Sequence, residues 1–241
     1  MRLEPPCKVT EEKLTFDIQE IEPLLQAPPM AMKPWPEAMC TLKDGRVLYI
    51  REAKPEDVPL MLEYMERVMK VDHDFYDIVG ARIYAEILGW HRKRLKDPFQ
   101  LVGLIDGEWA GFANGRMFSK DIGISLHTMT FARGGRLGWV MYYAKTYYVL
   151  DILGAQEWWS TFESHNGWKM AGLEMAQPMK PWPQMQHELG GAPIYYLNQK
   201  YWQKVIRNFL RTMIGTELTF DVPEEVKKKN ATFRIPKEVV V

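Results

Sequence analysis

The sequence is poor in cysteine, carries no excess of either charge and contains no long apolar run. Cys7 and Cys40 are the two cysteines in 241 residues, too few for a disulfide framework, so we expect reduced thiols in a cytoplasmic protein. Basic and acidic residues number 31 each, which argues against a nucleic-acid partner or an anionic membrane surface. No stretch approaches the length of a membrane span or resembles a signal-peptide core, so we expect no membrane partner.

Short motifs of several common chemistries are also missing. The five histidines show no metal-ligand spacing and have no cysteine pair nearby, which predicts no metal site. Neither the Gly-x-Ser-x-Gly turn of serine hydrolases nor the phosphate loop of nucleotide triphosphatases is present. These absences leave few reaction classes with direct support.

One stretch does point to a chemistry, the glycine-containing segment 133–138. It follows an alternating, strand-like segment over 124–131 and enters an apolar segment of helical length, 137–153, which Gly154 closes. A loop of this kind can offer backbone N–H groups and the positive end of a helix to a phosphate group. Residues 157–162 then have the composition of a buried strand.

The flanking segments predict an α/β organisation. The dipeptides Asp44-Gly45 and Asp106-Gly107 lie between apolar runs and indicate two tight hairpins. Apolar residues recur at helical spacing after Pro55 and again over 75–95. Prolines crowd the first 38 residues, which predicts an arm that lies on its own domain or on a neighbour.

Four segments in this order resemble the GCN5-related N-acetyltransferase (GNAT) family. They read IREAKPEDVPLMLEYM, FQLVGLIDGEWAGFANGR, LHTMTFARGGRLGWVMYYAKTYYVLDILGAQEWWSTFESHN and MQHELGGAPIYY. The resemblance implies an α/β fold with a mixed, mostly antiparallel sheet flanked by helices. It also implies that the sheet splays between its fourth and fifth strands and receives the pantetheine of an acyl-CoA there. The expected organisation is an arm with the first hairpin strand over 1–45, the GNAT-like domain over 46–202, and a C-terminal helix and tail over 203–241.

Acetyl-CoA, or another acyl-CoA, is the cofactor that this resemblance implies. Arg136 departs from the family pattern because it stands where a glycine lets the backbone approach the pyrophosphate, and the bulky Trp139 follows in the first turn of the helix. Two interpretations stay open: a loop that binds acyl-CoA, and a structural loop whose arginines are solvated or bind a partner. The residues expected to bind the cofactor are Arg133, Gly134, Gly135, Arg136, Leu137, Gly138 and Asn166.

Acyl transfer from a thioester to an amine needs a base, a donor to the oxyanion and an acid for the departing thiolate. The family often uses a tyrosine as the acid, but 167–177 contains none. Glu163, His165 and His127 are the catalytic candidates. Each has a plain structural alternative: a solvated strand end for Glu163, a surface or capping residue for His165, and a satisfied core histidine for His127.

Two functions therefore follow from the sequence. The first is acyl-CoA-dependent N-acyl transfer to an unknown acceptor, whose pocket 70–98 and 177–188 would build. The alternative is a non-catalytic GNAT-fold subunit of a larger assembly, such as a virion or multisubunit complex. In that case residues 1–38 and 214–241 would bind copies of this chain or other subunits at exposed sheet edges.

Overall fold

A computed structural model describes residues 18–21, 23, 29–162, 164–165, 167, 169, 177–178 and 194–240. Two of the candidate site residues, Glu163 and Asn166, lie outside these described residues. Most of the N-terminal arm and nearly all of the 177–188 segment, part of the expected acceptor pocket, also lie outside them.

Within the described residues, eight strands form one sheet in the order β1-β2-β3-β4-β5-β6-β8-β7. Neighbouring strands are antiparallel except for the pair β5 and β6, which is parallel. This mixed, mostly antiparallel sheet confirms the predicted fold class. The strands are β1 (Ala38–Thr41), β2 (Val47–Glu52), β3 (Pro98–Ile105), β4 (Glu108–Met117), β5 (Ile122–Thr130), β6 (Glu157–Ser160), β7 (Gln177–Pro178) and β8 (Tyr195–Asn198).

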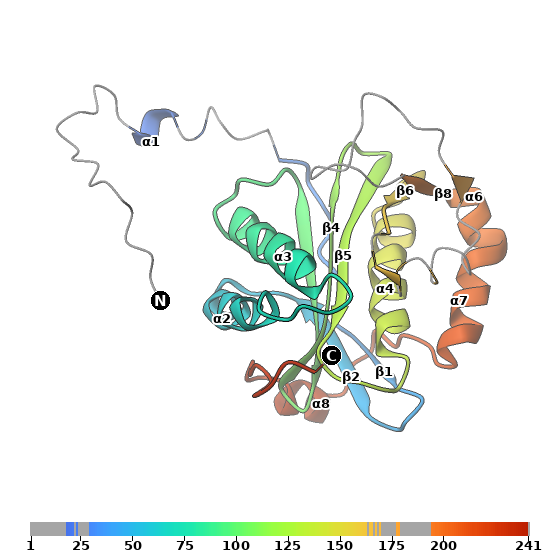
Figure 1. Ribbon diagram of the computed structural model, residues 1–241. Helices are drawn as coiled ribbons and strands as arrows, with labels where there is room; N and C mark the ends of the chain where they lie inside the picture. Colours follow the sequence, from blue (N-terminus) through green and yellow to red (C-terminus); the bar gives the residue numbers. More distant parts are fainter. Residues whose placement is uncertain are drawn as a thin grey trace, which may run out of the picture.

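Helices cover both faces of the sheet, with α2 and α3 on one side and α4 and α7 on the other (Figure 1). None of the helices in the described part of the chain is long and apolar enough to cross a membrane. The helical elements are α1 (Ile18–Ile21), η3 (Pro55–Asp57), α2 (Val58–Val68), α3 (Tyr76–His91), α4 (Leu137–Tyr147), the π-helical turn η4 (Tyr148–Ile152), α6 (Gln199–Tyr201), the π-helical turn η5 (Trp202–Ile206), α7 (Arg207–Ile214) and α8 (Glu224–Lys229).

The alternation of side chains along the strands divides the core into two layers. On β2, Leu48 and Ile50 belong to the core under α4 and α7, whereas Tyr49 between them belongs to the core under α2 and α3. Trp109 and Phe112 of β4 continue the second layer, with Trp109 completely buried. The sheet is therefore fixed from both sides, and this holds β4 and β5 in register beneath the site.

The parallel pair β5–β6 is short and opens along its length. Ile122, Gly123 and Ile124 pair with residues of β6, but β5 continues to Thr130 without β6 beside it. The splay that the family resemblance implied is thus present between these two strands. The loop that enters α4 lies at the end of β5, so the opening, the loop and the start of α4 are neighbours.

The C-terminal segment crosses back over the sheet. Thr219 forms a bridge with Met39 of the edge strand β1, and Arg234 forms one with Glu108. Between these bridges the chain forms α8, which contains the run Lys227 to Lys229. The sequence pattern had not indicated this helix, although glutamates in its first turn and lysines in its last turn match the helix dipole.

Candidate functional site

A cavity of about 210 Å³ occupies the opening between β5 and β6. One wall is the part of β5 from Ser125 to Thr130, and Phe162 lies in the wall that follows β6. Asp74 of the loop before α3 and Tyr76 at the start of α3 also line the cavity, which puts part of the expected acceptor region, 70–98, beside it. Helix α4 contributes a single stripe, Gly138, Tyr142 and Lys145.

A β-bulge shapes the wall around His127. Ala113 of β4 lies opposite Thr128, but the next pair joins Gly115 to Ser125, so Leu126 and His127 both face Asn114. The Asn114 side chain fills this irregularity, because its Oδ1 accepts a hydrogen bond from the His127 backbone N–H at 2.7 Å. Bulges change the direction of side chains, and His127, at this bulge, is one of the residues that line the cavity.

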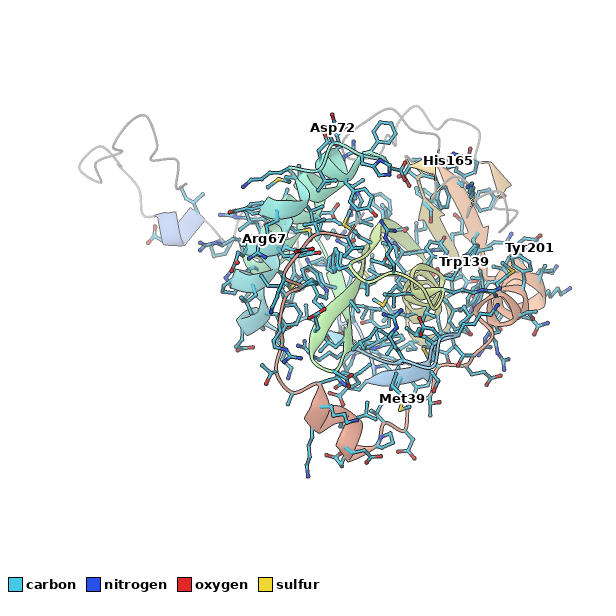
Figure 2. The ribbon with its side chains drawn as sticks, turned by 60° about the horizontal axis from the view of Figure 1, so that its bottom comes forward. Met39, Arg67, Asp72, Trp139, His165 and Tyr201 are labelled. Atoms are coloured by element: carbon cyan, nitrogen blue, oxygen red, sulfur yellow. The ribbon has the colours of Figure 1, made fainter. Side chains whose placement is uncertain are left out.

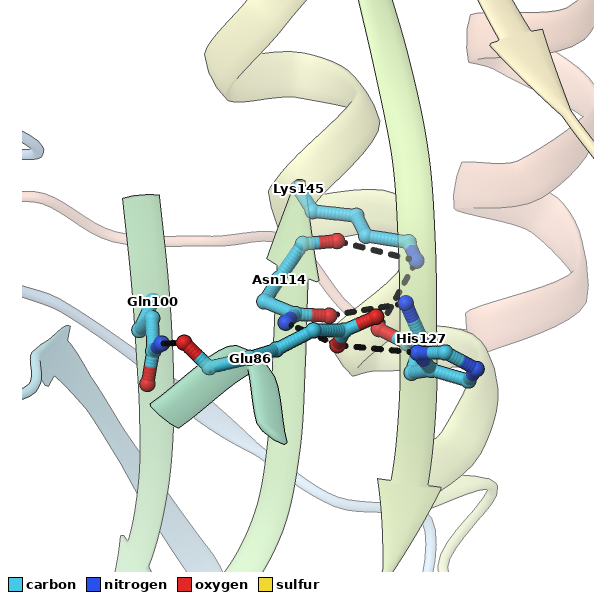
Figure 3. Close-up of polar contacts among 5 residues, drawn as sticks. All are labelled: Glu86, Gln100, Asn114, His127 and Lys145. Carbon is cyan, nitrogen blue, oxygen red and sulfur yellow. Dashed lines mark hydrogen bonds and ion pairs between the residues drawn. The ribbon is translucent and has the colours of Figure 1, made fainter. Parts of the chain in front are cut away.

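Glu86 of α3 holds the His127 ring (Figure 3). Its Oε2 atom lies 2.9 Å from His127 Nδ1 and accepts a second hydrogen bond from Asn114 Nδ2 at 2.7 Å. An ionised carboxylate only accepts hydrogen bonds, so the proton in the first contact belongs to Nδ1. The other ring nitrogen, Nε2, lies on the side away from Glu86 and, in the neutral ring, carries the lone pair that can accept a proton.

Lys145 approaches the same point of β5 from α4, on the other face of the sheet. Its side chain is 1% exposed, and its Nζ atom donates to the carbonyl oxygens of His127 at 2.9 Å and Asn114 at 3.4 Å. Nζ also lies 5.4 Å from the centre of the Tyr142 ring. A cation and a histidine–carboxylate pair therefore meet at one bulge, and Lys145 and His127 both line the cavity.

The loop at 133–138 is braced by the first hairpin. The Arg46 guanidinium bonds to the Asp44 carboxylate at 2.6 Å and to the Arg133 carbonyl at 2.6 Å. This hydrogen bond to Arg46 keeps the pKa of Asp44 below its usual value. Gly135 has φ +62°, and a Cβ there would lie 2.8 Å from Asp44 Oδ2, so this position requires glycine. The loop is thus held in one shape before any ligand arrives.

Neither Arg136 nor Trp139, the two departures from the family pattern, lines the opening. Arg136 adopts a left-handed backbone, φ 61°, and its guanidinium donates to the Met213 carbonyl at the end of α7. Trp139, in the first turn of α4, packs partly buried against the core under α4 and α7 (Figure 2). The gap between β5 and β6 is therefore not filled by either side chain.

The other candidates from the sequence lie at different depths. Arg133 and Gly138 line the cavity, and the Arg133 guanidinium reaches the Tyr76 hydroxyl at 3.1 Å. His165 is exposed, and its backbone N–H donates to Asp74 Oδ1 at 3.2 Å. His165 lies at the same end of the molecule as Asp72 (Figure 2). His165 thus belongs to the rim, whereas His127 belongs to the wall.

Three residues of the site did not emerge from the sequence: Glu86, Asn114 and Lys145. One of them left a signal, because Lys145 is the one charged residue in the apolar helix segment 137–147, and a lysine in such a position is rarely buried without a specific role.

Among the described residues, no group of three or more histidine, cysteine, aspartate or glutamate side chains is placed to hold a metal ion.

Comparison with known proteins bears on the fold. No protein-family model matches the sequence, and no curated protein sequence matches it. Among solved structures, Mycobacterium smegmatis RimJ in complex with CoA-disulfide is similar with a TM-score of 0.53 at 9% identity, covering 76% of this chain and 97% of that one. An uncharacterized protein from Bacillus halodurans gives a TM-score of 0.53 at 11% identity, with 75% and 99% covered. These likenesses confirm the GNAT-like fold.

Proposed function

We propose that the protein is an acyl-CoA-dependent N-acyltransferase that binds acyl-CoA in the opening between β5 and β6 and uses His127 as its base. The observation that carries the proposal is that His127, which lies in the wall of that opening, is paired with Glu86 behind it. A histidine oriented by a carboxylate, with its second nitrogen turned away from that carboxylate, is suited to accept a proton. The RimJ structure, which contains CoA-disulfide, supports the choice of ligand for this fold.

The residues around the cavity fit a CoA thioester. Gly138 leaves room on α4, because a Cβ there would meet only Thr130 Cγ2 at 3.7 Å, an ordinary contact. The chain's own packing therefore does not require glycine at 138, whereas a ligand passing along α4 would. Thr128 lines the cavity, and its buried hydroxyl has no hydrogen-bond partner among the described residues, so it can serve a polar ligand.

Arg133 is suited to the phosphate end of the ligand. It lies where the loop enters α4, at the cavity wall, and its guanidinium can pair with phosphate oxygens next to the positive end of the helix. Bound acyl-CoA would supply an activated acyl thioester. His127 Nε2 would take a proton from the attacking amine, and Glu86 Oε2 would stabilise the imidazolium through the proton on Nδ1.

Isothermal titration calorimetry with acetyl-CoA tests the proposal directly. We expect saturable binding to the wild-type protein, retained binding to His127→Gln, and loss of binding to Gly138→Leu, whose side chain would project into the cavity. Both variants should keep the thermal midpoint of the wild type within a few degrees. His127→Gln should in addition lose thiol release from acetyl-CoA with a panel of primary amines.

Absence of heat at millimolar acetyl-CoA with folded wild-type protein would reject acyl-CoA binding. The non-catalytic subunit would then be the better account of the chain. Binding that survives Gly138→Leu would instead place the ligand elsewhere. Amine-dependent thiol release that survives His127→Gln would remove His127 from the role of base while leaving the binding site intact.

A further inference from the structure

We propose that Lys145 is the catalytic group that stabilises the sulfur of the departing CoA and protonates it. The inference rests on the proposed function and assigns the acid that the sequence lacked, since no tyrosine occurs in 167–177. Lys145 lines the opening between β5 and β6 from α4.

The stripe on α4 gives the path along which the ligand would lie. Gly138, Tyr142 and Lys145 are spaced i, i+4 and i+7, which puts them on one face of the helix, and all three line the cavity. At 1.5 Å per residue, Lys145 lies about 10 Å along the helix axis from Gly138. A CoA whose phosphates meet the loop at Arg133 would extend its arm down this stripe, and its thioester would arrive at the deep end, where Lys145 lies.

The acid and the base approach β5 from opposite faces of the sheet. The His127 ring is held by Glu86 of α3 on one face, whereas Lys145 comes from α4 on the other (Figure 3). The Lys145 ammonium is tied to the His127 backbone carbonyl at 2.9 Å, so the two groups are fixed relative to each other. An acceptor amine could therefore meet His127 from the α3 side, while the thiol leaves along α4.

The surroundings of Lys145 suit a group that meets a transient anion. Burying an ammonium group costs several kcal/mol in general, and two of the hydrogen bonds of this one go to backbone carbonyl oxygens. Tyr142 adds a ring face near Nζ. A thiolate formed in the cavity would meet a desolvated positive charge, and an adjacent lysine lowers the pKa of a thiol.

The amine nitrogen forms a bond to the thioester carbon, and the carbon–sulfur bond breaks with its electron pair going to sulfur. His127 Nε2 takes the proton that the nitrogen loses, and Lys145 Nζ gives a proton to sulfur. The products are an amide and free CoA thiol. Proton exchange with solvent then returns His127 to the neutral form and Lys145 to the ammonium form.

Free CoA is the probe for the test, because its thiol can be titrated without knowing the acceptor. The ultraviolet absorbance of the thiolate gives the pKa of the bound thiol in wild type and Lys145→Gln. Glutamine can still donate to both carbonyls but carries no charge. We expect the bound thiol pKa in the wild type to lie about 1 unit or more below the value of about 8.5 typical of free thiols. Lys145→Gln should abolish this difference.

Desulfo-CoA, which lacks the sulfur, controls for folding. Wild type and Lys145→Gln should bind it equally, whereas the wild type alone should prefer CoA thiolate at alkaline pH. If Lys145→Gln fails to fold, Lys145→Met with the same two ligands replaces it. An equal thiol pKa in wild type and Lys145→Gln would overturn the role of Lys145. Failure of the wild type to bind either ligand would reject the proposed function itself.

Discussion

Substitution of Glu86 separates two contributions of this side chain, hydrogen-bond acceptance and negative charge. One oxygen, Oε2, makes both the contact to His127 Nδ1 and the bond from Asn114 Nδ2, and the Glu86 side chain is 11% exposed. Glutamine has the same shape and keeps one oxygen that can accept both bonds. Alanine removes the acceptor. Glu86→Gln therefore reports on the charge, and Glu86→Ala reports on the hydrogen bonds as well.

The stability effects of the two variants should differ clearly. Alanine leaves the Asn114 amide and the His127 ring without their acceptor, and each buried donor left unsatisfied costs about 1–3 kcal/mol, so we expect Glu86→Ala to lower the free energy of unfolding by about 2–6 kcal/mol. If the His127 proton moves to Nε2 in Glu86→Ala, Nδ1 is no longer a donor without an acceptor, and the loss should be about 2 kcal/mol. Glu86→Gln should lose less than about 1 kcal/mol. Urea unfolding followed by circular dichroism measures both.

The effect of Glu86→Gln on catalysis follows from the charge alone. A hydrogen bond to a charged group contributes about 1.5–3 kcal/mol and a neutral one about 1 kcal/mol, so the difference is about 0.5–2 kcal/mol. With the proton on His127 in the transition state, kcat should fall about 2–30-fold, while the KM for acetyl-CoA stays unchanged. Thiol release with excess amine measures this. Wild-type activity in Glu86→Gln, or equal stability of the two variants, would refute the assignment of the pair.

Three further predictions concern stability and reactivity. Asp57→Ala should lower the free energy of unfolding by about 3–5 kcal/mol, because Arg51 would lose its buried two-bond partner; a loss under 1 kcal/mol in denaturant unfolding would contradict this. Burial raises the pKa of Cys40 and of Tyr64 to about 12 each. Between about pH 9 and 12 these groups therefore stay neutral in the folded protein, whereas they ionise in the unfolded chain. The free energy of unfolding should fall as pH rises from about 9 toward 12. Cys40→Ala should flatten part of that slope; an unchanged slope would count against the buried thiol. Gly135→Ala should destabilise the protein by at least about 1 kcal/mol, since φ is +62° and a carboxylate oxygen lies 2.8 Å from the added Cβ, and an unchanged thermal midpoint would show that the loop can move.

The fold was predictable because its signals are local. Asp106-Gly107 gives the turn that joins β3 and β4, and Asp44-Gly45 gives the turn before β2. Gly154, with φ +74°, follows the helical segment at the place where the pattern predicted its end. Each of these depends on a few consecutive residues, so the order of the elements could be read along the chain. The family resemblance depended on that order, and the resemblance in turn predicted the mixed sheet.

The site was predictable only in part, because its groups come from different elements. Glu86, Asn114 and His127 lie on α3, β4 and β5, and they meet only because the bulge places two residues of β5 opposite one of β4. A bulge is a property of the register between strands, which no single stretch of sequence states. His127 was among the candidates, but its acceptor partner depends on how α3 packs on the sheet.

The sequence predicts that Arg136 binds the cofactor, whereas the structure turns its guanidinium toward the Met213 carbonyl. One substitution, Arg136→Gly, tests which of the two holds. In Arg136→Gly, the left-handed backbone at 136 is no longer held by a residue with a Cβ, which should stabilise the protein by about 1 kcal/mol. The same change removes the hydrogen bond to the Met213 carbonyl and makes the unfolded chain more flexible, which together should destabilise the protein by about 1–2 kcal/mol. We therefore expect stability within about 1 kcal/mol of the wild type in urea unfolding. Because the guanidinium is turned toward α7 and away from the opening, acetyl-CoA binding by calorimetry should be unchanged or tighter. A tenfold loss of affinity would mean that Arg136 leaves Met213 to pair with the phosphates of the ligand, and the loop would then bind them through its two arginines rather than through its backbone.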